Sequence, residues 1–369
     1  MSLYTNHTLK HRISRATPGV PPFVLATLLG CLFAGTAMAD VSSHVVTSIK
    51  PVHSLVSSVM KGVGEPHLIM QGAASPHAFS LRPSDATMLK DARIVFLIDK
   101  SMEISLINPV NTLASNARVV ILSKAKGVVH RNIREGGAFE AHSHEAEQHH
   151  MHHEHDEHSD AHEAEQDHVH HEHDEHPGEH EATHRDENHV AMEFGAYNMH
   201  IWLDPVNAAA MARMIAVALA EEDPANASVY ATNTERLLHR LDELIPVIAG
   251  QVAPVRDKPF IVLHDAYVHF ENRFGLSAAG SVMVGSEHSP GVQRIKVLRN
   301  KVRELGATCV FAEPQFNSRL VEVIVEGTPA QVGILDPLGA ALETGPEAYF
   351  TLLHNLAASF RECLALPDH

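Results

Sequence analysis

The sequence predicts an α/β protein with two lobes, each a mostly parallel sheet flanked by helices, joined by a long connecting helix. Short β-branched runs alternate with helical stretches along the chain, and such alternation is typical of parallel sheets covered by helices. The runs fall into two groups, one on each side of a long helical region. The expected strands are residues 44–49, 93–98 and 118–122 in the first lobe and 260–263, 307–311 and 331–335 in the second, with further helices at 52–60, 84–90 and 290–305.

The N-terminal residues have the order of a secretory signal peptide. Three basic residues precede an apolar run at 23–34, and small residues then lead to Ala39. This order predicts a signal peptide over residues 1–39 that is cleaved after Ala39, and the run is too short to favour a membrane-spanning helix. Residues 28–31 also resemble a bacterial lipobox ending at Cys31. Lipidation there ranks second, because the chain stays apolar beyond it and reaches a better cleavage site.

A long helical region separates the two groups of strands. It begins at Asp204 and Pro205, an aspartate N-cap followed by proline at the first helical position. Pro224 ends this helix, and a second one follows with apolar residues at helical spacing. Pro246 inside the second helix should kink or break it, and we take this helix as the connector between the lobes. The expected organisation is a signal peptide at 1–39, an N-terminal lobe at 40–222, a connecting helix at 223–253 and a C-terminal lobe at 254–369.

Residues 140–189 form an acidic, histidine-rich tract inside the N-terminal lobe. They hold 17 of the chain's 31 histidines and 17 acidic residues, against one basic residue, Arg185. Residues 144–158 and 162–176 are a tandem duplication that is identical at 13 of 15 positions. So few apolar side chains cannot offset the entropy of folding, which predicts a disordered insertion.

The tract is expected to be an auxiliary, weak metal site. Neutral imidazoles beside carboxylates bind borderline transition metals, Zn²⁺ above all. A solvated acidic linker that binds nothing in particular is the less favoured interpretation, given the density of imidazoles. The expected auxiliary ligands are His142, His144, His149, His150, His152, His153, His155, His158, His162, His168, His170, His171, His173 and His176.

The rest of the chain is close to balanced in charge. Nothing basic is left to attract nucleic acid, and no second apolar segment is long enough to span a membrane. Two cysteines remain after cleavage of the signal peptide, Cys309 and Cys363. An export compartment permits disulfides, so a bridge between them is favoured over two buried free thiols.

Four residues outside the tract are candidate metal ligands. His264 and Asp336 directly follow predicted strands, where ligands bind in open α/β sheets. His77 lies in a loop before a predicted helix, and His200 lies between the tract and the capped helix. Three imidazoles and one carboxylate suit tetrahedral zinc, whereas a hard cation needs more oxygens. Taken singly, a histidine at a strand end is more often an ordinary polar residue, and no local spacing forces these four together.

Five motifs, in order along the chain, carry a resemblance to a known family. They are SPHAFSLRPSD, NMHIWLDP, HDAYVHFENRFGL, AEPQF and LDPLG. Together they resemble the periplasmic zinc-binding (ZnuA-type) solute-binding proteins of metal-specific ABC importers. The resemblance covers essentially the whole mature chain and includes the acidic histidine-rich insertion ahead of the second ligand.

The resemblance implies a function as well as a fold. It implies that a Zn²⁺ ion, the transported ligand, is held in the cleft between two lobes and delivered to the permease of an ABC zinc importer. It also implies a periplasmic protein that is not an enzyme. By motif, it implies the ligands His77, His200, His264 and Asp336 and the cysteine pair Cys309 and Cys363. We also expect a monomer, with a periplasmic metallochaperone as a further partner through the tract.

Two positions bear on the choice of metal and of the fourth ligand. Some zinc-specific members carry an acidic residue immediately before the first ligand histidine, where this chain has Pro76. This departure favours Asp336 or a water molecule as the fourth ligand. Manganese-binding relatives have a carboxylate where this chain has His264, and the softer imidazole favours zinc.

Two other functions compete with transport. Residues 180–184 match the H-E-x-x-H pattern of zinc proteases, but that chemistry needs both histidines on one face of a stable helix, and this pentamer lies in a polar tract where chance matches are expected. An exported zinc buffer or adhesin would use the tract as its main site and the α/β body as a scaffold.

Overall fold

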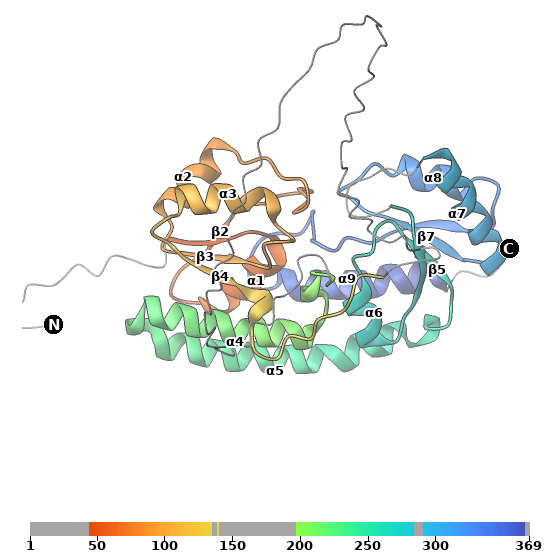
Figure 1. Cartoon of the computed structure of the whole chain (residues 1–369). Helices are drawn as coiled ribbons and strands as arrows, with labels where there is room; N and C mark the ends of the chain where they lie inside the picture. Colours follow the sequence, from red (N-terminus) through yellow and green to blue (C-terminus); the bar gives the residue numbers. More distant parts are fainter. Residues whose placement is uncertain (1–43, 135–138, 140–196, 284–290, 366–369) are drawn as a thin grey trace, which may run out of the picture. The chain divides into compact units, whose positions relative to one another are not determined.

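The computed structural model describes residues 44–134, 139, 197–283 and 291–365. Within them lie two four-stranded sheets in which all neighbouring strands are parallel (Figure 1). Helices flank both sheets, and a long helix lies between the two groups of strands in the chain. The predicted fold class is therefore confirmed.

The first sheet has the strand order β2-β1-β3-β4. Its elements are β1 (Val45–Thr47), α1 (Lys50–Val59), β2 (His67–Leu68), α2 (Pro83–Asp91), β3 (Ile94–Leu97), α3 (Ile104–Leu113) and β4 (Arg118–Ile121), followed by the 3-10 helix η2 (Leu122–Lys124). Strands β1, β3 and β4 coincide with the three predicted strands. Strand β2 was missed because it is only two residues long and has no alternating pattern of its own. Figure 1 shows α2 and α3 on one side of this sheet and α4 and α5 on the other.

Two long helices follow the tract. They are α4 (Pro205–Glu222) and α5 (Ala227–Val252), with the 3-10 helices η3 (Ile201–Leu203), η4 (Pro224–Asn226) and η5 (Ala253–Val255) around them. The Asp204 side chain accepts a hydrogen bond from the Val206 amide across 2.9 Å, so the predicted cap is confirmed. Pro246 does not break α5, which continues to Val252. Ile248 and Val252 beyond it are fully buried, and this burial stabilises the last turns despite the lost hydrogen bond.

The second sheet has the strand order β6-β5-β7-β8. Its elements are β5 (Phe260–Val262), α6 (Val268–Phe274), β6 (Ala278–Ser281), α7 (Val292–Leu305), β7 (Cys309–Ala312), α8 (Arg319–Val325), β8 (Gln331–Ile334) and α9 (Ala348–Leu364). Strands β5, β7 and β8 coincide with predicted strands. Strand β6 was missed because its sequence, AAGS, contains none of the β-branched or aromatic residues that mark strands.

Among the described residues, the larger of two hydrophobic clusters continues across both sheets. It runs from Val45 in β1 through Trp202 and the buried side of α5 to Phe360 in α9. Helix α9 follows the second sheet in the chain, yet it also packs against α1 of the first, and the Tyr349 hydroxyl donates to the Trp202 carbonyl across 2.7 Å. Helix α9 therefore supports the segment that carries His200.

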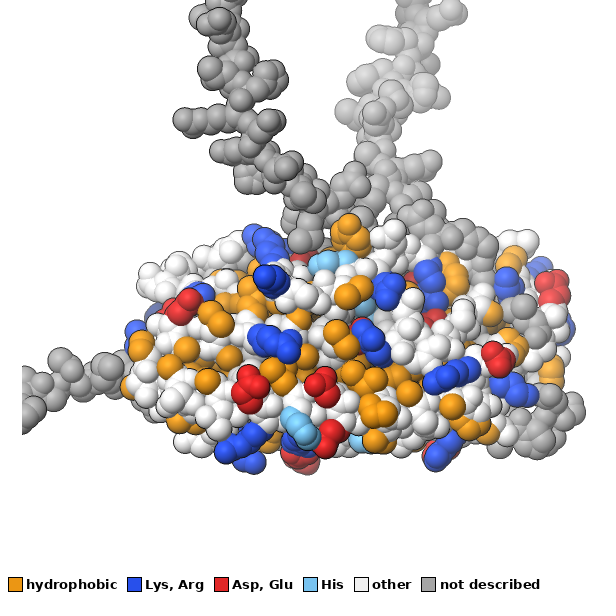
Figure 2. Space-filling view, turned by 90° about the horizontal axis from the view of Figure 1, so that it is seen from below, with side chains coloured by type: hydrophobic (Ala, Val, Ile, Leu, Met, Phe, Trp, Pro, Cys, Tyr) orange, Lys and Arg blue, Asp and Glu red, His pale blue; other side chains and the backbone are white. Residues whose placement is uncertain are grey.

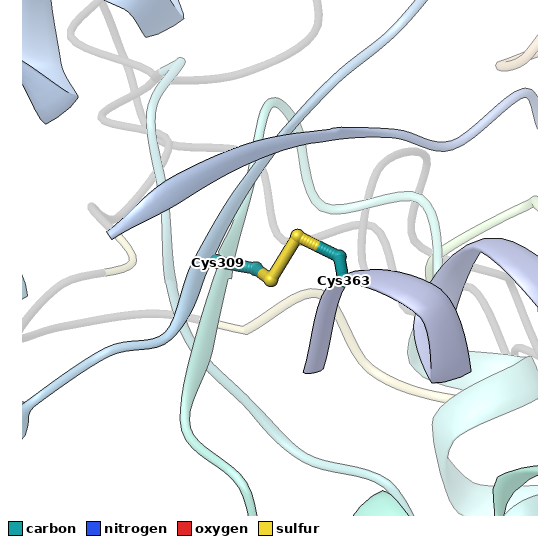
Figure 3. Close-up of a disulfide and its surroundings, with 2 residues drawn as sticks. All are labelled: Cys309 and Cys363. Carbon is teal, nitrogen blue, oxygen red and sulfur yellow. A yellow bond between two sulfur atoms is a disulfide. The ribbon is translucent and has the colours of Figure 1, made fainter. Parts of the chain in front are cut away.

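A disulfide joins Cys309 in β7 to Cys363 in α9 (Figure 3). The predicted bridge is confirmed. It closes a loop with a sequence separation of 54 residues, and such a loop contributes about 4 kcal/mol of stability in the chain-entropy model.

The described surface is mixed in character. On the face shown in Figure 2, acidic and basic side chains are interspersed among apolar ones. Within the described ranges, no helix is both long and apolar enough to cross a membrane.

Candidate metal centre

Three histidines from distant segments meet at the carboxyl ends of the strands. His77 lies in the loop between β2 and α2, His200 directly precedes η3, and His264 follows β5. Each offers one ring nitrogen, and these nitrogens lie within 4.8 Å of one another; no other such group of histidine, cysteine or acidic residues occurs in the described part of the chain. The ring centroids form a triangle with sides of 5.4, 5.9 and 5.1 Å.

Hydrogen bonds determine which nitrogen of two rings faces the centre. Nδ1 of His200 donates to the Asn198 Oδ1 across 2.9 Å, and Nδ1 of His264 donates to the Glu313 Oε1 across 2.7 Å. With the proton on Nδ1, the neutral form of each ring carries its lone pair on Nε2. A metal-binding histidine usually has its second ring nitrogen bonded to an oxygen in this way.

The two lone pairs face one another at short range. The Nε2 atoms of His200 and His264 are 3.2 Å apart, and the two nitrogens of a tetrahedral zinc site with ordinary bond lengths are about 3.3 Å apart. Two acceptor nitrogens this close repel each other unless a cation lies between them. The Nε2 atom of His77 is also buried and has no hydrogen-bond partner. All three nitrogens are thus available to one cation.

Burial keeps the imidazoles of His77 and His200 neutral. His200 is only 7% exposed. Burial, followed by the neighbouring His264, lowers the pKa of His77 from 6.5 to about 3. Burial, followed by His264 and His77, holds the pKa of His200 well below its ordinary value. Neutral imidazole is the form that binds metal, so both rings are ready to bind at neutral pH.

The pocket around the three rings fits a single ion. Its walls include Met102, Trp202 and Phe316, and its free volume is about 10 Å³, close to that of one water-sized sphere. An organic ligand needs a cavity of at least about 300 Å³. The dimensions of the pocket therefore exclude a small organic molecule and admit a metal ion.

Asp336 is not among the residues that the structure brings together. Its carboxylate accepts hydrogen bonds from the amides of Leu338, Gly339 and Ala340 across 3.1, 2.9 and 2.6 Å. It also accepts one from the Gln315 side chain across 2.9 Å. Asp336 therefore holds the loop that follows β8, and that loop lines the pocket at Pro337 and Leu338.

Glu313 was missed by the sequence reasoning although a signal for it was present. It directly follows β7, at the same sheet edge that drew attention to His264 and Asp336. Its side chain is 0% exposed. Asn198 was missed as well, because a neutral asparagine two residues before a histidine has no distinctive local pattern. Each of the two contacts one of the three histidines, Glu313 the ring of His264 and Asn198 that of His200.

Some predicted features lie outside the described residues. They are the fourteen auxiliary histidines of the tract, from His142 to His176, the pentamer at 180–184, Cys31 and the cleavage site after Ala39. The structure begins again at Tyr197, whose backbone pairs with Asn132. Asn132 and Tyr197, described residues before and after the insertion, are thus paired, and Tyr197 lies three residues before His200.

Comparison with known proteins identifies the family. The model of the family described as "Zinc-uptake complex component A periplasmic" (ZnuA) matches residues 45–363. The chain belongs to the ZnuA family. It is 49% identical over 333 residues to the high-affinity zinc uptake system protein ZnuA of Brucella suis, covering 90% of this chain and 95% of that protein. The Yersinia pestis protein of the same name is 33% identical over 339 residues, covering 92% and 96%.

Solved structures of ZnuA and related proteins share the fold. A crystal structure of ZnuA superposes with a TM-score of 0.64 at 20% identity, covering 87% of this chain and 98% of that one. A mutant structure of the laminin-binding adhesin Lmb from Streptococcus agalactiae gives a TM-score of 0.63 at 21% identity, covering 87% and 99%. At these identities the likeness concerns the fold alone.

Membership of the ZnuA family confirms several expectations. The family is periplasmic by its description and is a component of a zinc-uptake complex. The expectations of a transport protein rather than an enzyme, of zinc as the ion and of a periplasmic location are therefore confirmed. The family also confirms that the chain is one part of an uptake system.

Proposed function

We propose that this chain captures one Zn²⁺ ion with the imidazoles of His77, His200 and His264 and delivers it to the permease of an ABC zinc importer. The observation that carries the proposal is the convergence of three ring nitrogens within 4.8 Å. The names of the ZnuA relatives, high-affinity zinc uptake system proteins, support the transport role.

The donor set favours zinc over harder cations. Three neutral imidazoles are borderline ligands that suit Zn²⁺, whereas Mn²⁺ and Mg²⁺ prefer oxygen donors. The side chain of Glu313 lines the same pocket, and its Oε1 atom accepts the hydrogen bond from His264. We propose that its charge acts through the His264 ring. Hydrogen bonding to a carboxylate makes the imidazole a more basic ligand.

The fourth position is best filled by water. Asp336, the fourth ligand expected from the sequence, accepts four hydrogen bonds within its own loop and from Gln315. Binding zinc directly would require its oxygens to give up several of these bonds. A water molecule requires no such change and leaves an exchangeable position through which the ion can be released.

The tract of residues 140–189 is proposed as a weak collector and not as the specific site. Zinc titration in competition with a chromophoric chelator distinguishes the weak sites of the tract from the tight site of the three histidines. A variant lacking residues 140–189 should keep one tight equivalent of zinc, and His264→Ala should lose it. His239→Ala is the matched control, because His239 has a side chain that is 73% exposed. Loss of all tight binding on removal of the tract, with wild-type binding in His264→Ala, would instead favour the zinc-buffer function.

Zinc absorption-edge spectroscopy tests the ligand set independently. Zinc bound to the variant without the tract should have three imidazoles and one or more light oxygen ligands. A count of one imidazole or none would contradict the assignment of the three histidines.

The finer points of export and assembly are also proposals. We propose cleavage after Ala39 rather than lipidation at Cys31, lobe boundaries near residues 222 and 253, and a monomer that receives zinc from a periplasmic metallochaperone through the tract. The mass of the mature protein tests the first point, since an N-terminus at Asp40 and an acylated Cys31 differ by many residues. Sedimentation tests the monomer, co-purification with a zinc-loaded chaperone tests the transfer through the tract, and limited proteolysis tests the lobe boundaries.

A further inference from the structure

The hydrogen bonds of Asn198 connect the two lobes. Asn198 lies two residues before His200 and is 5% exposed. Its backbone amide donates to the Arg131 carbonyl across 2.8 Å, and its backbone carbonyl accepts from Nε2 of His269 across 2.8 Å. The backbone is thus held on both sides, which leaves the side-chain amide with one defined location.

The orientation of that amide follows from its partner in the second lobe. The Asn198 Nδ2 donates to the Asp265 carbonyl, which can only accept. The amide oxygen must therefore face the other way, towards His200. There it accepts from the His200 backbone amide across 3.1 Å and from the His200 Nδ1 across 2.9 Å. Because the oxygen can only accept, the proton of the neutral His200 ring must be on Nδ1.

The Asn198 side chain also links His200 to the segment of His264, because its partner Asp265 is the next residue after His264. The side chain of Asp265 is held by Arg134, whose guanidinium also pairs with Glu271 across 2.7 Å. The residue whose carbonyl orients Asn198 is therefore itself held by a partly buried ion-pair network. In this way the backbone that carries His264 determines which nitrogen of His200 faces the metal.

We infer that Asn198 is a positioning residue for zinc, which selects the Nδ1–H tautomer of His200 and ties the segment of His200 to that of His264. The inference rests on the proposed function, because it takes His200 as a ligand. Without the amide oxygen, the neutral ring is free to move its proton to Nε2, and that tautomer offers no lone pair to the ion. Outer partners of this kind typically contribute about 10–100-fold in metal affinity.

The test compares two buried asparagines in the full-length protein. Asn198→Ala removes the positioning amide. Asn233→Ala is the matched control, because Asn233 is 7% exposed and donates to the carbonyls of Val59 and Lys61 across 3.0 and 2.8 Å, with no contact to the histidines. Zinc affinity is measured by chelator competition. The tautomer of His200 is read in the zinc-free protein from the nitrogen-15 shifts of its ring, assigned by their loss in His200→Gln.

Asn198→Ala should weaken zinc binding by about 10–100-fold and shift part of the His200 population to the Nε2–H tautomer, whereas Asn233→Ala should change neither. Asn198→Asp keeps the acceptor and should keep the Nδ1–H tautomer, which provides a second reading if the alanine variant does not fold. An unchanged tautomer in Asn198→Ala, an Nε2–H tautomer in Asn198→Asp, or an equal loss of affinity in Asn233→Ala overturns the inference. Tight zinc binding by His200→Ala overturns the proposed ligand set instead, and the tautomer measured without zinc separates the two failures.

Discussion

Nδ1 of His264 and Oε1 of Glu313 are 2.7 Å apart in a buried pair, and the Glu313 side chain is 0% exposed. The two residues follow neighbouring parallel strands, β5 and β7. The carboxyl ends of parallel strands meet at one sheet edge, so this pairing is a direct product of the fold. It holds the His264 ring with its Nε2 atom towards His77 and His200.

Replacing the charge of Glu313 should weaken zinc binding. Glu313→Gln keeps the size of the side chain but offers only a neutral acceptor to Nδ1, so His264 becomes a less basic ligand. We expect the zinc affinity, measured by chelator competition, to fall by about 10-fold or more. The variant should remain folded, as judged by its far-ultraviolet circular dichroism spectrum. Glu347→Gln is the control, because Glu347 pairs with Arg240 at the exposed surface. Unchanged affinity in Glu313→Gln would show that the carboxylate does not act on the metal through His264.

The zinc-free protein should lose stability as the pH falls. In the unfolded chain His77 takes up a proton near its ordinary pKa of 6.5, whereas in the folded protein its pKa is about 3. Between these values the unfolded state binds more protons, so the free energy of unfolding decreases as the pH is lowered through this window. His77 should contribute a slope of about 1 kcal/mol per pH unit.

Urea denaturation of zinc-free protein at about pH 7.5 and about pH 5 measures this slope. His77→Gln should lose less stability between the two conditions than the wild type. His239→Gln, a change at an exposed side chain, should behave as the wild type does. If His77→Gln and the wild type lose the same stability, the buried neutral state of His77 is not the cause.

Gly333 should not tolerate a larger side chain. A Cβ atom at this position in β8 would lie 2.5 Å from two ring carbons of Phe311 and 3.0 Å from the Cys363 sulfur. Gly333→Ala should destabilise the protein by about 1–3 kcal/mol through overpacking. Gly250→Ala is the matched control: a Cβ there meets nothing within 4 Å, and alanine should stabilise α5 by about 0.5–1 kcal/mol. Thermal unfolding compares the two, and equal melting temperatures would contradict the predicted clash.

Asp336 should contribute to stability more than to zinc affinity. Lys50, buried in the first lobe, donates to the carbonyls of Gly339, Ala340 and Leu342 across 2.6, 3.0 and 2.6 Å. The Asp336 carboxylate accepts from amides of the same loop. The loop is therefore held by a positive charge at its carbonyl oxygens and by a negative charge at its amides. Asp336→Ala should cost about 3 kcal/mol of stability, since several buried donors lose a charged acceptor.

The zinc affinity of Asp336→Ala decides whether the carboxylate is a ligand. If it only holds the loop, affinity falls much less than in His264→Ala. The control is Asp257→Ala at an exposed position. A loss of zinc affinity as large as that of His264→Ala, without a loss of stability, would make Asp336 the fourth ligand.

Much of the fold was predictable because its signals are local. The strands around Val95 and Val310 are short, fully buried runs that contain β-branched and aromatic residues, and the start of α4 follows from Asp204 and Pro205. Strand β6 was not predictable, because its small residues are extended only by pairing with β5. The passage of α5 through Pro246 was not predictable either, since the burial of Ile248 against distant helices outweighs the local cost of proline.

The sequence by itself determined the α/β class, the two groups of strands, the cysteine pair and the three histidines that the structure brings together. These features were predictable because periodicity, caps and strand ends depend on residues close together in the sequence, and because the family motifs are short continuous segments. Only the tertiary structure decided between the two carboxylates at the sheet edge. Glu313 and Asp336 both follow strands, but the loop after β8 offers Asp336 three backbone amides, whereas Glu313 meets the ring of His264. The tautomer of His200 was decided in the same way, by the Asp265 carbonyl of the other lobe, because hydrogen bonds depend on distances that folding alone creates.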